Sequence, residues 1–243
     1  MMIDQLSEHT NRVKNIFNRV ASRYDLMNDL MSFGLHRVWK RQFVQRLSVK
    51  PEAHYVDVAA GTGDITRLIH KKIVSHGLVP CISAVDPNAS MMGQGKAKLI
   101  DGGIITGVNW VQALAEDLPF EDSSVDAITI SFGLRNVTDR EKALCEFYRV
   151  LKPGGQFLCL EFSEVQHKHV NAAYTFYSRN VIPKLGKYMI EKQEDPPYEY
   201  LVDSIQRFPN QPMLKNMIES AGFKKVNFTN LTDCIVAIHV GGK

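Results

Sequence analysis

The chain has 243 residues, of which 44% are hydrophobic and 23% charged, and its formal net charge is +3. A chain of this length can bury one substantial α/β core, and so mild a positive charge does not require a nucleic-acid partner. No apolar run approaches the roughly 18 residues of a membrane span. The first residues, Met1–Asn11, include Asp4 and Glu8 and have no apolar signal core. We therefore expect a cytoplasmic protein of the bacterial type, although a processed organellar chain would look the same.

The four cysteines are scattered along the chain and form no close pair. We expect all of them to be buried, reduced thiols rather than disulfides or zinc ligands; they are Cys81, Cys145, Cys159 and Cys234. His167 and His169 have no Cys or carboxylate nearby at ligand spacing, so we expect no metal site.

Residues 1–50 are predicted to be a helical segment, because apolar side chains recur at helical spacing between Val13 and Tyr24. Residues 165–210 are aromatic and partly helical, and are predicted to be an insertion after the fifth strand. Apolar side chains in such a pattern usually pack in the protein core. The functional alternative is that both segments form the lid and wall of a lipophilic substrate pocket.

Between these segments and after them, residues 51–243 alternate between strand and helix patterns, which predicts an α/β fold with a mostly parallel, Rossmann-like sheet. The predicted strands are His54–Val58, Cys81–Val85, Val108–Gln112, Ala127–Ser131 and Gln156–Glu161. The predicted helices are Asp64–Ser75, Asn88–Leu99, Asp139–Leu151 and a last one near Pro212–Ala221. Two final strand patterns, Lys224–Thr229 and Cys234–His239, predict an antiparallel hairpin that brings the sheet to seven strands.

The turn after the first strand indicates a nucleoside cofactor. It contains Gly61 and Gly63, which let the backbone approach a ligand closely, and the helix that follows presents unpaired N–H groups. The second strand ends at Asp86, whose carboxylate can accept both hydroxyls of a ribose. A dinucleotide fingerprint would need a third glycine at Thr66. The turn instead resembles the glycine-rich loop of class I S-adenosylmethionine methyltransferases, with Ala59 and Ala60 at its first two glycine positions.

The fourth predicted strand runs into Arg135 and Asn136. Ligands of open α/β sheets lie beyond the carboxyl ends of the strands, so we expect these polar groups to face the reactive end of the cofactor. The alternatives are a surface ion pair for Arg135 and a helix cap for Asn136. Because Thr138 or Asp139 already suits the cap, the second alternative is weaker.

Two longer segments make the resemblance specific. Residues 20–34 (VASRYDLMNDLMSFG) and residues 130–139 (ISFGLRNVTD) are similar to the signatures of the ubiquinone/menaquinone biosynthesis C-methyltransferases. The likeness extends from about Asn15 to His239. It implies S-adenosylmethionine as the cofactor and a lipophilic quinol as the substrate: a polyprenyl benzoquinol, a demethylmenaquinol or both, methylated on a ring carbon.

The resemblance also implies roles for individual residues. Thr62 would hold the methionine end of the cofactor, Asp86 the ribose and the Ala115 backbone the adenine, while Ser131 would lie beneath the sulfonium and Asp57 would organise the turn. Family members usually carry Asn or Asp at the position of Leu114, which cannot bond the adenine amino group.

The catalytic prediction centres on Arg135, with Asn136 as a second donor to the oxygen of a quinol that is losing its proton. A guanidinium stays protonated in proteins, which disfavours Arg135 as the base. Tyr24, His36 or water could take the proton, and the sequence does not choose among them.

Two other functions stay open at this point. Asp195-Pro196-Pro197-Tyr198 spells the catalytic motif of DNA amino-methyltransferases, but it follows the fifth strand instead of ending the fourth, so we expect a loop with two prolines. The other alternative is a non-catalytic, cofactor-binding scaffold of a quinone-synthesis complex. A basic cluster is predicted to be a solvated face or a docking site for anionic lipid at the inner face of the membrane; its residues are Arg37, Lys40, Arg41 and Arg46. The sequence leaves open whether the protein forms a homodimer.

Overall fold

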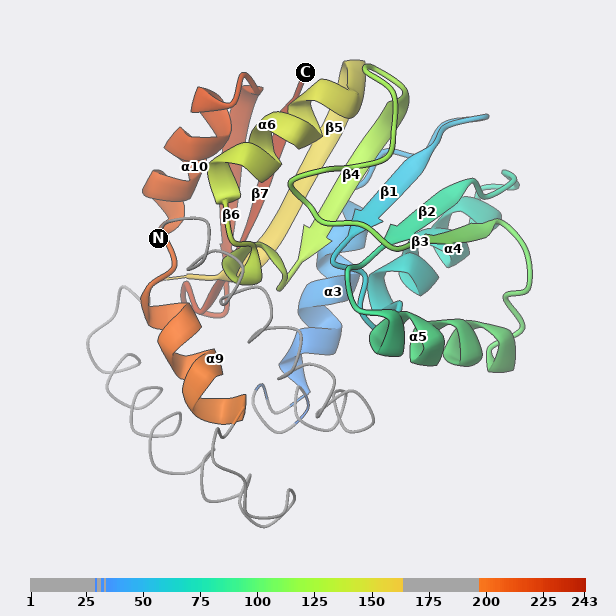
Figure 1. Cartoon of the computed structure of the whole chain (residues 1–243), viewed down its shortest axis with the longest axis horizontal. Coiled ribbons are helices and arrows are strands. Elements are labelled where there is room, and N and C mark those ends of the chain that lie inside the picture. The colour runs from blue at the N-terminus through green and yellow to red at the C-terminus, as the bar shows by residue number, and fades with distance from the viewer. Residues whose placement is uncertain (1–28, 30–31, 33, 164–196) are drawn as a thin grey trace.

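The computed structural model describes residues 29, 32, 34–163 and 197–243, and its centre is a sheet of seven strands in the order β3-β2-β1-β4-β5-β7-β6 (Figure 1). The strands are β1 (Tyr55–Val58), β2 (Ile82–Val85), β3 (Val108–Val111), β4 (Val125–Ser131), β5 (Leu151–Phe162), β6 (Lys224–Leu231) and β7 (Val236–Gly242). β7 is antiparallel to both of its neighbours, and the pairs among β1 to β5 are parallel. The predicted α/β fold and its terminal antiparallel hairpin are thus confirmed.

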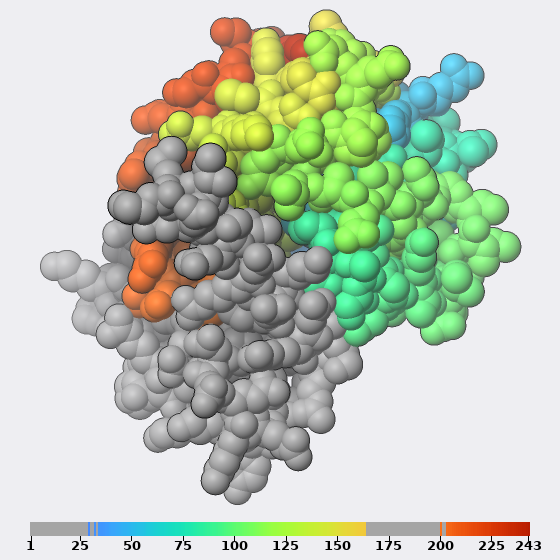
Figure 2. All heavy atoms as spheres, viewed as in Figure 1, coloured from blue at the N-terminus to red at the C-terminus, as the bar shows by residue number. Residues whose placement is uncertain are grey.

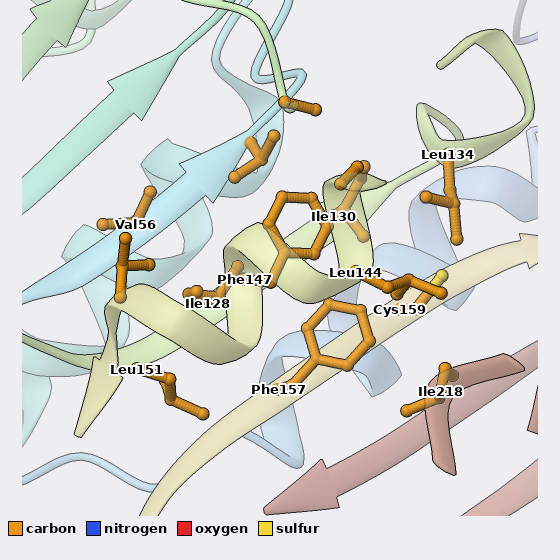
Figure 3. Close-up of a cluster of buried hydrophobic side chains, with 14 of the residues drawn as sticks. Val56, Ile128, Ile130, Leu134, Leu144, Phe147, Leu151, Phe157, Cys159 and Ile218 are labelled. Carbon is orange, nitrogen blue, oxygen red and sulfur yellow. The ribbon is translucent and has the colours of Figure 1, made fainter. Parts of the chain in front are cut away.

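The described helices are α3 (Leu35–Gln45), α4 (Asp64–Ser75), α5 (Ala89–Asp101), the short 3-10 helix η2 (Leu134–Asn136), α6 (Arg140–Val150), α9 (Pro197–Gln206) and α10 (Gln211–Ser220). Some of them pack on each face of the sheet. Phe147 of α6 and Ile218 of α10 belong to the core cluster on one face, drawn in Figure 3. Phe43 of α3 and Ile69 of α4 belong to the cluster on the other face.

The middle of β5 is an apolar run, Phe157–Leu160. Phe157 and Cys159 belong to the first cluster, whereas Leu158 and Leu160 belong to the second. Successive side chains of a strand point to opposite faces, so this run is apolar at each position because helices cover it on both sides.

The order of the strands creates the place where a ligand can bind. The chain runs outward from β1 through β2 to β3 and then returns to place β4 on the other side of β1. The segments after β1 and after β4 therefore leave the sheet in opposite directions, which opens a crevice at the carboxyl ends of these strands.

The predicted boundaries are wrong at the turn before β5. The strand begins at Leu151, directly after α6, although the prediction started it at Gln156. Leu151 already pairs with Val125 of β4, and the ladder is irregular between Val125 and Ala127. Lys152–Gly155 is thus an irregularity within the strand, with Gly154 at a φ of 79°.

The predicted burial of the cysteines is half wrong. All four thiols are free, but only Cys159 and Cys234 are buried, and Cys81 and Cys145 are exposed. Cys145 follows Ala143 and Leu144, which form the buried stripe of α6, so helical geometry turns it outward.

Several predictions concern residues that the structure does not describe, including Tyr24, the stripe before it, His167, His169 and residues 165–196. The predicted loop with two prolines is wrong in its second half, because Pro197 and Tyr198 begin α9. Proline suits the first turn of a helix, where its missing N–H has no intrahelical partner. No helix among the described residues is long and apolar enough to cross a membrane.

Candidate functional site

A cavity lies at the carboxyl ends of β1, β2, β3 and β4, formed by the segments that follow these strands. Its lining residues are Val58, Ala59, Gly61, Asp86, Pro87, Asn88, Met91, Ala113–Glu116, Ser131–Gly133 and Asn136–Thr138. Figure 2 shows the molecule from the same side as Figure 1, with the green residues that follow β3 beside the teal residues of α5. Six predicted site residues therefore line one cavity: Gly61, Asp86, Leu114, Ala115, Ser131 and Asn136.

Three alternate residues of the turn after β1 have left-handed backbone. Ala59, Gly61 and Gly63 have φ values of 53°, 55° and 78°. A Cβ atom added to Gly63 would lie 3.0 Å from Leu99 Cδ1 and 3.1 Å from Trp110 Cη2, so this glycine allows the turn to pack closely against α5 and β3. Ala59 adopts the same region with a side chain, at a cost of about 1–2 kcal/mol.

Asp86 joins the turn after β1 to the start of α5. Its Oδ2 accepts a hydrogen bond from Gly61 N at 2.8 Å, and its Oδ1 accepts one from Asn88 N at 2.8 Å. Burial raises the pKa of this carboxyl, and the two backbone donors oppose that rise. Each oxygen still has a lone pair for a ligand, so the carboxylate is held rigidly with accepting capacity toward the cavity.

Asp57, the residue before the end of β1, bonds to the two elements beside it, and its role in organising the turn stays a prediction. It is buried, and its carboxylate accepts hydrogen bonds from Thr66 Oγ1 at 2.6 Å and from Thr129 Oγ1 at 2.9 Å. These bonds link β1 to α4 and to β4. Burial raises the pKa of Asp57 from its usual 3.8 to about 6.

The segment after β3 is held by Glu116, which itself lines the cavity. Its Oε1 accepts hydrogen bonds from Thr138 N and Asp139 N, both at 3.1 Å, and so fastens this segment to the one after β4. Leu114 is 44% exposed, and Ala115 is buried. The backbone between Ala113 and Glu116 is therefore presented along one wall of the cavity.

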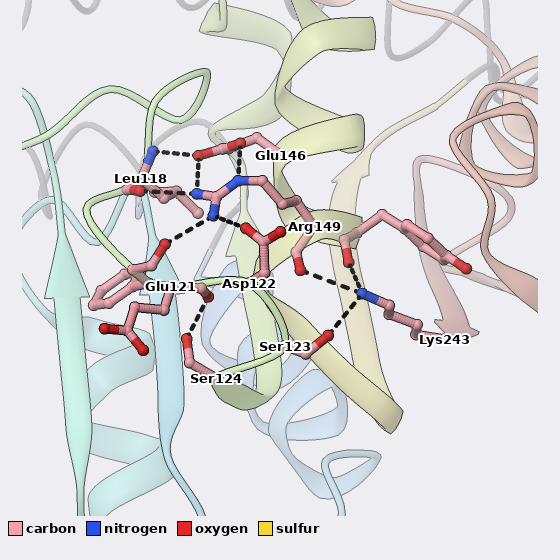
Figure 4. Close-up of polar contacts among 10 residues, drawn as sticks. Leu118, Glu121, Asp122, Ser123, Ser124, Glu146, Arg149 and Lys243 are labelled. Atoms are coloured by element: carbon pink, nitrogen blue, oxygen red, sulfur yellow. Dashed lines mark hydrogen bonds and ion pairs between the residues drawn. The ribbon is translucent and has the colours of Figure 1, made fainter.

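A second network anchors the same segment to α6 (Figure 4). Arg149 donates to Glu146 Oε1 at 2.6 Å and to the carbonyl oxygens of Leu118 and Phe120 at 3.2 and 2.9 Å. Glu146 Oε1 also accepts from Leu118 N at 2.9 Å. Hydrogen bonds from Arg149 lower the pKa of Glu146, so this carboxylate stays charged as it holds the loop.

The end of β4 contributes a polar atom that lacks a protein partner. Ser131 Oγ is buried and has no hydrogen-bond partner in the described part of the chain, although Ser131 lines the cavity. A buried hydroxyl without a partner costs free energy unless a ligand or water completes it. This orphaned hydroxyl is a sign that the cavity receives a polar ligand.

Arg135 does not line the cavity. Its guanidinium is buried, and Nη1 donates to Glu161 Oε1 and Oε2 at 3.2 and 3.1 Å and to Phe132 O at 2.6 Å. Glu161 also accepts from Arg135 N at 3.2 Å. The surface ion pair offered as the alternative is therefore wrong, because the pair is buried. All three side-chain bonds use Nη1, and Nε has no hydrogen-bond partner among the described residues. A direct contact between Arg135 and a substrate stays a prediction.

Two other predicted residues of the described chain, Thr62 and His36, do not line the cavity. Thr62 is buried and His36 is buried on α3, where its Nδ1 lies 2.9 Å from Ser32 Oγ, and neither is a lining residue. Burial lowers the pKa of His36, so it is neutral at pH 7. Tyr24 lies outside the described residues.

The basic cluster on α3 is only partly a solvated face. Lys40 is buried and its Nζ lies 2.8 Å from Asp64 Oδ2, while Arg37 donates to Asp29 Oδ1 at 2.9 Å. Two of the four predicted cations are therefore neutralised by carboxylates, and Arg41 and Arg46 are exposed.

Sequence reasoning missed several lining residues. Asn88 caps α5 by accepting from Ser90 N at 3.0 Å and Met91 N at 3.1 Å, and its position just before a helical pattern could have revealed it. Met91 and Phe132 carry no such signal, because an apolar side chain that lines a cavity looks like a core residue in the sequence.

Comparison with known proteins decides the family. The model of the ubiE/COQ5 methyltransferase family matches residues 5–243. The chain belongs to this family. It is 49% identical over 231 residues to the ubiquinone/menaquinone biosynthesis C-methyltransferase UbiE of Shewanella halifaxensis, covering 95% of this chain and 90% of that one. It is 47% identical over 236 residues to UbiE of Proteus mirabilis, covering 97% and 92%.

Solved structures of low sequence identity share the fold of this family member. A SAM-dependent methyltransferase from Thermotoga maritima, described as a possible histamine N-methyltransferase, superimposes with a TM-score of 0.65 at 20% identity, covering 94% of this chain and 99% of that one. A putative S-adenosyl-L-methionine-dependent methyltransferase from Methanococcus maripaludis gives 0.61 at 17% identity, covering 93% of each chain.

Asp57 predicts a specific pH dependence of stability. Because the folded state binds its proton more tightly than the unfolded state, the contribution of Asp57 is most favourable below pH 3.8 and falls as the pH rises to about 6. Relative to Asp57→Asn, the wild-type free energy of unfolding should fall by about 1 kcal/mol between roughly pH 5 and pH 7.5. Urea unfolding at both pH values measures this difference.

Glu146→Gln is the matched control for that experiment. Hydrogen bonds from Arg149 and from Leu118 N hold the pKa of Glu146 below its usual value despite its partial burial, so this carboxyl is ionised throughout the same window. Its replacement should change the free energy of unfolding equally at both pH values and leave the pH dependence unchanged. Equal slopes for the wild type and Asp57→Asn would contradict the interpretation of Asp57.

Leu114→Asn should bind S-adenosylmethionine as tightly as the wild type or about fivefold more tightly, because the amide can add one hydrogen bond worth about 1 kcal/mol. Leu114 is 44% exposed, so its loss removes little packing. Titration calorimetry of the wild type, Leu114→Asn and Leu114→Ala separates the added hydrogen bond from lost apolar contact. Clearly weaker binding by Leu114→Asn would refute the expectation.

Proposed function

We propose that this protein is an S-adenosylmethionine-dependent C-methyltransferase of ubiquinone/menaquinone biosynthesis, acting on a ring carbon of a polyprenyl benzoquinol, a demethylmenaquinol or both. The observation that carries the proposal is the 49% identity to a UbiE enzyme over 95% of the chain. At this identity the chain spans nearly the whole of that relative, which supports a shared reaction as well as a shared fold.

The cavity suits this cofactor. The Asp86 carboxylate would accept the ribose hydroxyls, and the backbone from Ala113 to Glu116 would contact the adenine. The unpartnered Ser131 hydroxyl would lie near the sulfonium end. When bound, S-adenosylmethionine supplies a methyl group on a sulfonium, which a ring carbon accepts with loss of the ring proton.

The protein's contribution is to orient the quinol and stabilise the negative charge that develops on its oxygen. Asn136, which lines the cavity, is proposed as a donor to that oxygen. Arg135 is proposed to act from the adjacent buried pair with Glu161. Tyr24 remains a proposed proton acceptor or substrate contact.

Base methylation in nucleic acids is a weaker candidate. The Asp-Pro-Pro-Tyr motif would have to end β4 beside the cofactor, whereas Tyr198 lies in α9 and β4 ends at Ser131. Because prenylated quinols partition into bilayers, we also propose that the enzyme works at the inner face of the membrane, as a peripheral protein that takes its substrate from the lipid.

Deletion of the gene in its host should cause demethylated quinones to accumulate in extracted lipids. The wild-type gene should restore the methylated products, and Asp86→Ala should not, because it removes both the ribose acceptor and the acceptor of Gly61 N. Mass spectrometry of the quinone fraction identifies which ring system depends on the enzyme. A normal quinone profile in the deletion strain would count against the proposed function.

Arg135→Lys should lower the methylation rate at least about tenfold, or about 1.4 kcal/mol in the barrier. A lysine keeps one charged nitrogen, which can replace the Nη1 bonds to Glu161 and Phe132 O, but it lacks the planar guanidinium and its remaining N–H donors. Cofactor affinity should stay unchanged, because Arg135 does not line the cavity. Single-turnover methyl transfer with calorimetry measures both quantities, and thermal unfolding checks that the variant folds. Unchanged turnover would remove Arg135 from the mechanism.

A further inference from the structure

Helix α9 brings a tyrosine to the polar end of the cavity. α9 lies outside the sheet, on the side toward which β4 points, and it contacts η2 (Figure 1). The Tyr200 hydroxyl donates a hydrogen bond to Asn136 Oδ1 at 3.1 Å, although the two residues are 64 positions apart in the chain. Tyr200 is half-buried, so its hydroxyl is held at the site instead of turning freely in solvent.

This contact decides which end of the Asn136 amide is available to a ligand. Oδ1 accepts from Tyr200, and Nδ2 faces the Phe132 carbonyl oxygen at 3.5 Å, which can only accept. The second contact is long, because Phe132 O already accepts from Arg135 Nη1 at 2.6 Å. The amide hydrogens of Nδ2 are therefore only weakly engaged within the described part of the chain.

Of the two neighbours Arg135 and Asn136, only Asn136 presents its side chain to the cavity. The charge of Arg135 is countered by Glu161, whose side chain is 1% exposed, and Arg135 is not among the lining residues. Asn136 does line the cavity. A donor, and not an acceptor, is what an oxygen that gains negative charge requires.

Tyr200 strengthens that donor as well as orienting it. A hydrogen bond accepted at an amide oxygen polarises the amide and makes its N–H groups better donors. Arg140 lies close enough to interact electrostatically with the Tyr200 phenol, and a nearby cation makes a hydroxyl a stronger donor. Arg140 is held in turn by its bond to Arg135 O at 3.1 Å and by the Phe208 ring, 5.3 Å away.

We propose that Tyr200 is a positioning residue that presents Asn136 Nδ2 as a hydrogen-bond donor to the quinol oxygen next to the methylated carbon. The inference rests on the proposed function, since it names the oxygen of that substrate. Tyr200 acts through Asn136. It neither takes a proton nor forms a covalent bond, and the ring proton lost on methylation leaves by another acceptor.

Tyr200→Phe keeps the ring and removes only the hydroxyl. We expect kcat to fall about five- to tenfold, as for the loss of one hydrogen bond in the transition state, with the Kd for S-adenosylmethionine and the melting temperature unchanged. The assay measures methyl transfer to a reduced, short-chain prenylated hydroquinone. Tyr148→Phe is the matched control: its ring packs against Phe223, away from the cavity, and its kcat should equal that of the wild type.

A double-mutant cycle separates positioning from general structural support. In an Asn136→Ala background, Tyr200→Phe should have no further effect on kcat, because the group that it orients is gone. Asn136→Asp should keep the bond from Tyr200 but provide no donor, and should lose at least as much activity as Asn136→Ala. Additive effects in the cycle, or a fully active Asn136→Asp, would overturn the inference.

The outcomes distinguish this inference from the proposed function. If the wild type methylates the hydroquinone and Tyr200→Phe matches it, the inference fails and the function stands. If the wild type binds S-adenosylmethionine but methylates neither a benzoquinol nor a naphthoquinol, the proposed function fails, and the role of Tyr200 in it fails too.

Discussion

The close approach of two turns determines the shape of the ligand cavity. A Cβ atom added to Gly133 would lie only 2.4 Å from Ala59 Cβ, so the segment after β4 touches the turn after β1 before the two diverge. Such an approach is possible only where one of the two residues has no side chain. Because β1 and β4 are neighbours in the sheet, this contact forms the floor of the cavity, and the positions of Ser131, Phe132 and Asn136 follow from it.

The loops around this floor are held by buried or half-buried carboxylates. Asp86 accepts from Gly61 N, Glu116 from Thr138 N, Glu146 from Leu118 N and Glu161 from Arg135 N. Each bond joins segments that are distant in sequence. A carboxylate that accepts backbone N–H groups both satisfies donors that a loop would leave unpaired and restrains the loop strongly. The cavity is thus organised before a ligand arrives, which reduces the entropy lost on binding.

Two adjacent residues after β4 point their side chains in different directions. Arg135 turns away from the cavity into a buried pair with Glu161, whereas its neighbour Asn136 turns toward the cavity and meets Tyr200 from α9. A buried guanidinium needs a paired carboxylate, because an uncompensated charge in the interior is costly. The arrangement leaves a neutral amide at the cavity, which can donate to a developing negative charge without the cost of bringing a full charge out of water.

The sequence alone determined the fold class, the seven strands with their terminal antiparallel hairpin and many of the residues that line the cavity. Apolar runs that alternate with amphipathic helices specify a covered sheet, and a small-residue turn followed by Asp86 specifies a nucleoside site, because both signals are local in the chain. The boundary before β5 and the exposure of Cys81 and Cys145 were missed, since ladder pairing and the facing of a single residue depend on neighbours in space.

Only the tertiary structure decided which polar residues meet. Arg135 and Asn136 are adjacent in sequence and were predicted to face the same ligand, yet one pairs with Glu161 of β5 and the other with Tyr200 of α9. Asp57 bonds Thr129, and Glu116 bonds Thr138, across gaps that no short motif spans. The physical reason is that a hydrogen bond between distant segments depends on how the sheet and its helices pack, and a sequence pattern reports only the period of each element by itself.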